Sequence, residues 1–126
     1  MATVPLVATK LARGVQIITW SPLTQANPDG DWFDTEGGPF FPDKTLHIYG
    51  TPGAGGTFVI EGSNGPAQES PVTLTDIHGG AASYTANSID VLAENPRAIR
   101  PRLSAGGDGT TSMTVILVCH AIRPYK

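Results

Sequence analysis

The stretch from Thr110 to Ile122 constrains the fold more than any other part of this chain. Its β-branched residues pack well on a pleated sheet and lose side-chain freedom on a helix, so they favour a strand. Both faces of that strand are largely apolar, which predicts a central strand covered on both sides. The two faces are Met113, Val115, Leu117, Cys119 and Ala121, and Thr114, Ile116, Val118, His120 and Ile122.

Glycine and proline interrupt the rest of the chain. The 126 residues include 15 Gly and 11 Pro, and only 81–95 and 110–123 are long stretches without either. This spacing leaves little room for helices and favours short strands joined by turns. A chain of this length is most simply one domain with its own core. The single cysteine, Cys119, has no partner for an intrachain disulfide and is expected to be a buried apolar residue.

Alternation of apolar and polar residues predicts about eight short strands, with hairpins at the glycine-rich turns 50–56 and 106–109. Residues 87–94 are ambiguous, because Asn87 or Ser88 could cap a short helix there, but we prefer strands. The predicted fold is all-β, an antiparallel β-sandwich of the jelly-roll or Greek-key type. The expected strands span 15–20, 44–49, 57–62, 72–74, 83–86, 89–92, 98–103 and 110–122.

Residues 1–13 show no clean period and contain Pro5, which predicts an extended N-terminal arm ahead of a single domain at 14–126. This segment has no leading basic region, and its apolar run is broken by Pro5, so we expect no signal peptide. No apolar run approaches membrane length, and no membrane partner is expected.

A long connection at 21–43 is the first candidate for function, because loops of this length in compact domains are usually functional. Its large aromatic residues must pack against this domain or against another subunit. They are Trp32, Phe33, Phe40 and Phe41.

An arginine edge is the second candidate. Alternation at 98–103 places Pro101 inward, at an edge strand or a bulge, and Arg100 and Arg102 outward, with Arg97 just before them. Guanidinium groups there could bind carboxylates or backbone carbonyls of a partner, or could simply protect a sheet edge from aggregation. Nucleic acid is not expected, since the net charge is −3 and acidic residues would repel phosphate.

Motifs for catalysis or metal binding are weak. Gly50 and Gly55 have the separation of a phosphate-binding loop, but Gly56 stands where lysine is needed and a strand follows. The acidic segment Asp29–Glu36 reads as solvated turn residues, with a calcium site left open. No histidine has a paired-ligand spacing for zinc. We therefore expect no enzyme, no cofactor and no zinc site.

Three segments and the apolar strand after them resemble small structural proteins of tailed bacteriophages. The segments are 58–64 (FVIEGSN), 94–101 (ENPRAIRP) and 105–111 (AGGDGTT), and the likeness covers roughly residues 56–122. In plan the chain is similar to the capsid cement, or decoration, proteins of short-tailed phages, which are β-sandwich or jelly-roll modules on the outer shell. This resemblance implies a non-enzymatic protein, made in the host cytoplasm, that self-associates as a dimer or trimer and bridges neighbouring major capsid subunits in the virion.

The expected partner-binding residues come from the arm, the aromatic loop and the arginine edge. A sugar-binding jelly roll with Trp20, Trp32 and Tyr84 as stacking platforms is one alternative, and a phage tail or head-to-tail joining protein is another. The expected partner-binding set is Leu6, Val7, Leu11, Trp32, Phe33, Phe40, Phe41, Arg97, Arg100 and Arg102.

Overall fold

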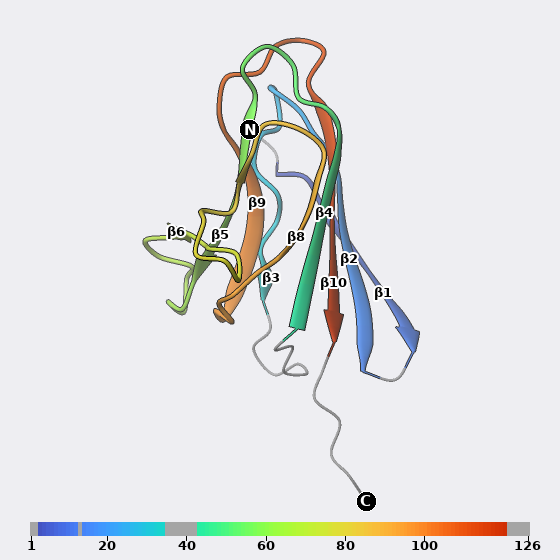
Figure 1. Ribbon diagram of the computed structural model, residues 1–126, viewed down its shortest axis with the longest axis vertical. Coiled ribbons are helices and arrows are strands. Elements are labelled where there is room, and N and C mark those ends of the chain that lie inside the picture. Colours follow the sequence, from blue (N-terminus) through green and yellow to red (C-terminus); the bar gives the residue numbers. More distant parts are fainter. Residues whose placement is uncertain (1–2, 13, 35–42, 121–126) are drawn as a thin grey trace, which may run out of the picture.

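The computed structural model describes residues 3–12, 14–34 and 43–120, and Figure 1 shows strands and turns throughout this part of the chain. It contains ten strands and no helix, arranged as two antiparallel five-stranded sheets packed together as a sandwich. The all-β prediction is confirmed. The strands are β1 Leu6–Ala12, β2 Val15–Leu23, β3 Phe33–Asp34, β4 Asp43–Thr51, β5 Thr57–Ser63, β6 Val72–Thr73, β7 Ser83–Tyr84, β8 Ser88–Val91, β9 Ala98–Ala105 and β10 Ser112–His120.

The first sheet has the strand order β1-β2-β10-β4-β8, so β10 is its central strand, as expected. In Figure 1, β2, β10 and β4 run side by side, with β9 and β5 of the other sheet to their left. Leu117 of β10 lies opposite Ile18 of β2 and Leu46 of β4, and all three side chains are fully buried. The core is therefore built on the inward face of β10.

The outward face of β10 differs from the expectation. Thr114, Ile116 and Val118 remain partly exposed, whereas the inward residues on either side of them are fully buried. The prediction that both sides are covered is wrong for the described residues. An apolar pattern on two faces indicates that both can be covered, but whether a second layer exists depends on how many strands the chain supplies.

The second sheet has the order β3-β9-β5-β6, with β7 also paired to β5. Pro101 is buried on β9 while Arg100 and Arg102 point outward, as the alternation predicted. The expected edge strand or bulge at Pro101 is wrong, because β9 lies between β3 and β5 and pairs with β5 in regular register there. The proline still leaves no hydrogen bond unmade in the ladder with β5. The Pro101 carbonyl accepts a hydrogen bond from the Gly30 backbone N–H at 2.9 Å. Because the nitrogen and carbonyl of one residue in an antiparallel strand point to the same side, the Pro101 nitrogen also faces Gly30 and not β5.

The two predicted hairpins are wrong. β4 pairs with β10 and β8, whereas β5 pairs with β9, β6 and β7, so the turn at 50–56 carries the chain from the first sheet to the second. The turn at 106–109 carries it back, from β9 to β10. A period of two shows which residues share a face, but it does not show which strand pairs with which.

The predicted arm at 1–13 is corrected in its described part. Residues 6–12 form β1, which pairs with β2 along the edge of the first sheet, and Val4 is buried in the core. The backbone N–H of Val4 donates to the carbonyl of Asp29 at 2.8 Å. Pro5 precedes β1 and so does not interrupt its ladder. β1 and the short β3 bring the expected eight strands to ten.

Residues 83–91 contain β7 and β8, so the preference for strands over a helix at 87–94 is confirmed. β8 pairs with β4 at the edge of the first sheet, where Ile89 lies opposite His47. The described part of the chain contains no helix long and apolar enough to cross a membrane.

Candidate interaction surfaces

An arginine cluster lies on the outward face of the second sheet, where β9 and β5 pair. Arg100 lies opposite Glu61 in the ladder. The Arg100 Nε donates to Glu61 Oε1 at 2.8 Å, and the Arg102 Nε donates to the same carboxylate at 3.2 Å. The Glu61 side chain is 4% exposed, so two cations hold one buried anion. We call Arg97, Arg100, Arg102, Glu61 and Trp32 the arginine cluster.

The aromatic loop and the arginine edge, predicted as separate candidates, meet in this cluster. The guanidinium carbon of Arg100 lies 4.6 Å from the ring centroid of Trp32, a cation–π contact. Arg100 also lies 3.9 Å from the Asp29 carboxylate, and the Arg97 Nε lies 3.7 Å from Asp34. The arginines that we predicted to bind carboxylates of a partner are therefore already paired with carboxylates of this chain.

The outward face of the first sheet is chemically different. Its strands present aliphatic side chains and hydroxyls, and Asp43, opposite His120 at one end, is the only charged carboxylate among its described outward residues. His47 and Tyr49 are in ring contact there, with centroids 4.8 Å apart. We call this surface, apart from Asp43 at its end, the uncharged face. Its residues are Val7, Thr9, Val15, Ile17, Thr19, Ser21, Thr45, His47, Tyr49, Ile89, Val91, Thr114, Ile116, Val118 and His120.

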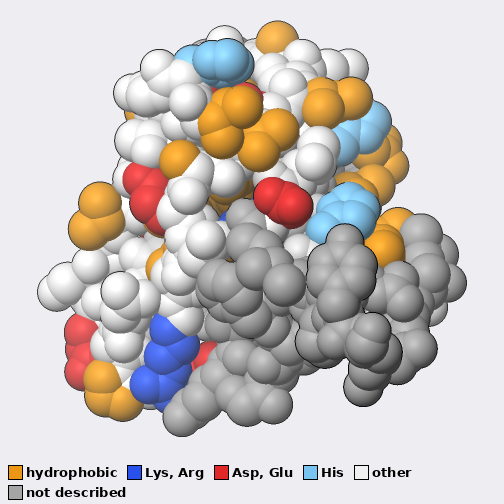
Figure 2. Space-filling model, turned by 60° about the horizontal axis from the view of Figure 1, so that its bottom comes forward, with side chains coloured by type: hydrophobic (Ala, Val, Ile, Leu, Met, Phe, Trp, Pro, Cys, Tyr) orange, Lys and Arg blue, Asp and Glu red, His pale blue; other side chains and the backbone are white. Residues whose placement is uncertain are grey.

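Figure 2 shows from another side where the basic side chains lie. The visible Lys and Arg side chains gather at the lower left, whereas the histidines and most of the visible hydrophobic side chains lie higher and to the right. Two residues at the borders of the uncharged face, Val7 and Ile89, are 62% and 69% exposed. Between them lie the partly exposed Ile17, Ile116 and Val118, and apolar side chains grouped on one sheet face are typical of an interaction surface.

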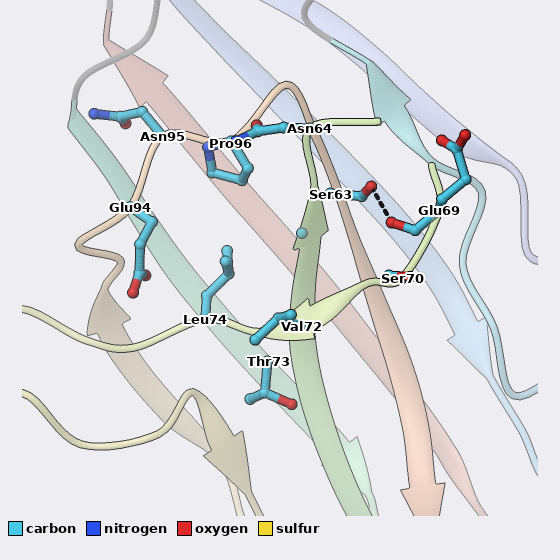
Figure 3. A pocket seen from close by; sticks show the side chains of 11 residues that line it. Ser63, Asn64, Glu69, Ser70, Val72, Thr73, Leu74, Glu94, Asn95 and Pro96 are labelled. Carbon is cyan, nitrogen blue, oxygen red and sulfur yellow. Dashed lines mark hydrogen bonds between the residues drawn. The ribbon is translucent and has the colours of Figure 1, made fainter. Parts of the chain in front are cut away.

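A pocket of about 370 Å³ opens beside β5 and β6 and is shown in Figure 3. It contains two carboxylates, Glu69 and Glu94. A hydrogen bond from the Ala67 backbone N–H lowers the pKa of Glu69. Burial alone would raise the pKa of Glu94, but hydrogen bonds from Thr75 have the larger combined effect, so the pKa of Glu94 is also lowered. Both are therefore ionised at neutral pH and lack a proton to donate. The lining residues are Gly62, Ser63, Asn64, Glu69, Ser70, Val72, Thr73, Leu74, Glu94, Asn95 and Pro96.

A lysine inside the sandwich is a feature that the sequence analysis missed. Lys44 is 3% exposed, lies opposite Cys119 in the ladder, and donates to the side-chain oxygen of Asn95. Burial lowers the pKa of Lys44 and raises the pKa of the Cys119 thiol to about 11. The alternation that turns Leu46 and Ile48 inward also turns Lys44 inward, so the signal was present in the sequence.

The remaining predicted contact residues do not form one site. Leu6 and Phe33 are partly buried and pack against the core, and Val7 lies on the uncharged face. Leu11 belongs to β1, but its side chain lies outside the described residues, as do Phe40 and Phe41. Of the three sugar-stacking candidates, Trp20 and Tyr84 are buried in the core, which leaves Trp32.

The described acids of the candidate calcium segment make other contacts. Asp29 and Asp34 lie near arginines, and Asp31 accepts a hydrogen bond from the Thr3 hydroxyl. Among the residues that the structure describes, no group of three or more His, Cys, Asp or Glu is placed to hold a metal ion.

Comparison with known proteins returns no match: no protein-family model, no curated protein and no solved structure is significantly similar to this chain. Functional interpretation therefore depends on the two outward faces.

Proposed function

We propose that this protein is a virion structural protein, a capsid decoration protein that binds the outer surface of a phage coat shell and bridges neighbouring major capsid subunits. The observation that carries this proposal is the contrast between its two outward faces. One presents the arginine cluster and the other is the uncharged face. A bridging module must contact two neighbours at once, and a rigid sandwich with two chemically distinct faces suits that task.

The arginine cluster is the proposed contact with the coat protein. Trp and Arg are the side chains most enriched among residues that dominate binding energy in protein interfaces. Trp32 is partly exposed and is held by Arg100, while the side chain of Arg102 is 35% exposed beside them. Because Glu61 and the Trp32 ring hold these side chains in place, a partner would lose little of their conformational freedom on binding.

Repeated binding sites over the shell allow weak individual contacts to give strong binding overall. A module held at one coat subunit meets the next at a high effective concentration, so modest affinities multiply across a capsid. The finer fold assignment, a jelly roll or Greek key, belongs to the same proposal. It is supported by connections that cross between the sheets, among them β4 to β5 and β9 to β10.

Co-sedimentation with expanded empty capsids of the source phage tests this proposal. We expect the purified protein to pellet with capsids at micromolar concentration, and Trp32→Ala and Arg102→Ala to weaken that binding. Val72→Ala, an exposed apolar change on β6, is the matched control and should bind as the unmodified protein does. Failure of the unmodified protein to pellet would count against a capsid role.

Two other functions remain as alternative outcomes. Binding to a glycan array that is lost in Trp32→Ala would favour a sugar-binding module, since Trp32 is the remaining stacking candidate on the surface. Rings of defined symmetry in negative-stain images of the purified protein would favour a tail or head-to-tail joining protein.

A further inference from the structure

The uncharged face has the size of a protein interface. It spans five adjacent strands, the longest of nine residues. Strands lie about 4.8 Å apart and rise about 3.3 Å per residue, so the face measures roughly 20 by 30 Å, or about 600 Å² in plan. Side-chain relief raises its accessible area toward the roughly 800 Å² per partner of a standard stable complex.

The chemistry of this face suits a second copy of itself. In a twofold interface the same patch occurs on both partners, so like groups approach one another and any charge near the axis meets its own sign. Ile17, Ile116 and Val118 occupy the middle of the face and carry no charge. The surrounding Thr and Ser hydroxyls each donate and accept hydrogen bonds, so they can pair with their own kind.

Other partners fit this face less well. A membrane surface with anionic headgroups attracts Lys and Arg, and none lies among the residues of the uncharged face. A partner chosen by charge would be recognised better at the arginine cluster, which lies on the other sheet.

We propose that two copies of this chain associate through their uncharged faces, sheet against sheet about a twofold axis, with Ile17, Ile116 and Val118 in the centre. The dimer buries side chains that are partly exposed in one copy and leaves both arginine clusters on its outside. If the proposed capsid role is correct, the dimer carries two coat-binding faces. Self-association itself does not depend on that role, because it needs no capsid.

Sedimentation velocity of the purified full chain from about 1 to 100 µM tests this inference. We expect a dimer at the upper concentrations, and we expect Ile116→Lys to weaken dimerisation at least about tenfold, because it places two ammonium groups near the axis. A monomer at every concentration would overturn the inference, as would a trimer, since pairing two faces closes at two copies.

Two exposed valines provide a second test, which does not depend on whether the Ile116→Lys variant folds. Val7 lies on the uncharged face and Val72 lies on β6, and they are 62% and 68% exposed, so lysine at either position should leave the fold intact. We expect Val7→Lys to weaken the dimer and Val72→Lys to leave it unchanged. Equal effects of the two substitutions would overturn the assignment of the surface.

The capsid assay separates this inference from the proposed function. If the Ile116→Lys variant is monomeric and still pellets with capsids, the result supports both the self-association surface and the capsid role, with the coat contact on another surface. A dimer that never pellets supports the self-association surface and counts against the capsid role.

Discussion

The Arg100 side chain crosses from β9 to β5 and donates its Nε–H to Glu61 at 2.8 Å, where the carboxylate is almost fully buried. Glu61 also receives the Nε–H of Arg102, so one acid fixes two arginines on the outward face of the second sheet. The positions of Arg100 and Arg102 therefore depend on one shared, buried carboxylate.

Removing Glu61 should cost more stability than removing Asp29, the partly exposed acid beside the same arginine. Glu61→Ala leaves two partly exposed cations without their shared buried carboxylate, and the free energy of unfolding should fall by about 1–3 kcal/mol. Asp29→Ala removes a carboxylate 3.9 Å from Arg100 whose side chain is 34% exposed, and it should cost under about 1 kcal/mol. Urea denaturation of both variants measures the difference, and similar losses would contradict this account of the cluster.

Two glycines with the same backbone conformation should respond differently to alanine. Gly55 and Gly106 have φ values of +65° and +68°, a left-handed conformation that costs a residue with a Cβ about 1–2 kcal/mol. A Cβ at Gly55 meets nothing within 4 Å, whereas one at Gly106 would lie 2.0 Å from the Gly55 carbonyl oxygen. Thermal denaturation should show that Gly106→Ala is clearly less stable than Gly55→Ala. Equal melting temperatures would mean that the crossing between β9 and β10 adjusts easily.

The two faces of β10 should differ in their contribution to stability. Leu117 is fully buried at the centre of the first sheet, so Leu117→Ala should lower the free energy of unfolding by about 2–5 kcal/mol. Its neighbour Ile116 points outward and is partly exposed, so Ile116→Ala should cost less when measured at concentrations low enough to keep the protein monomeric. A larger loss of stability for Ile116→Ala than for Leu117→Ala would contradict the assignment of Leu117 to the buried face of β10.

Cys119 should be inert in the folded protein. Its side chain is fully buried, and burial raises the pKa of the thiol from 9.0 to about 11, so very little reactive thiolate exists near pH 8. A thiol reagent such as Ellman's reagent should label it slowly in native buffer and rapidly in denaturant. The raised pKa also predicts a stabilising contribution below the unfolded value that is lost as the pH rises toward 11. Fast labelling of the native protein would contradict the buried position.

Asp108 should make stability depend on acid pH. Its carboxylate accepts the Thr110 hydroxyl and the backbone N–H groups of Thr110 and Ala54, and these bonds lower its pKa below the usual value of 3.8. A lowered pKa means that the carboxylate stabilises the fold above its unfolded pKa and that this contribution is lost as the pH falls through the folded value. Asp108→Asn should therefore be less stable at neutral pH and should lose less stability between about pH 5 and pH 2.

Asp76→Asn offers a comparison for this effect at another turn. The Gly80 and His78 backbone N–H groups lower the pKa of Asp76, so the same sign of pH dependence is expected there. If Asp108→Asn kept the full acid dependence of the unmodified protein, the link between the turns at 50–56 and 106–109 would not be the origin of that dependence.

Local patterns predicted strands well and predicted their partners poorly. The run at 98–103 correctly gave its inward and outward residues, and β10 was correctly placed at the centre of a sheet. The glycine-rich turns at 50–56 and 106–109 were interpreted as hairpins although each crosses between the sheets. Turn composition shows that a chain reverses, but a hairpin and a crossing can use the same glycines.

Sequence alternation by itself determined that this protein is a sheet protein and determined which residues share each face, because side chains in a strand alternate with a period of two. Tertiary structure alone decided which faces are buried together and which remain on the surface. It placed Glu61 between Arg100 and Arg102, brought Trp32 onto Arg100, and left Ile116 exposed while Leu117 is buried. These relations join residues far apart in the chain, and strand pairing, which brings them together, depends on the whole domain and not on any local run of residues.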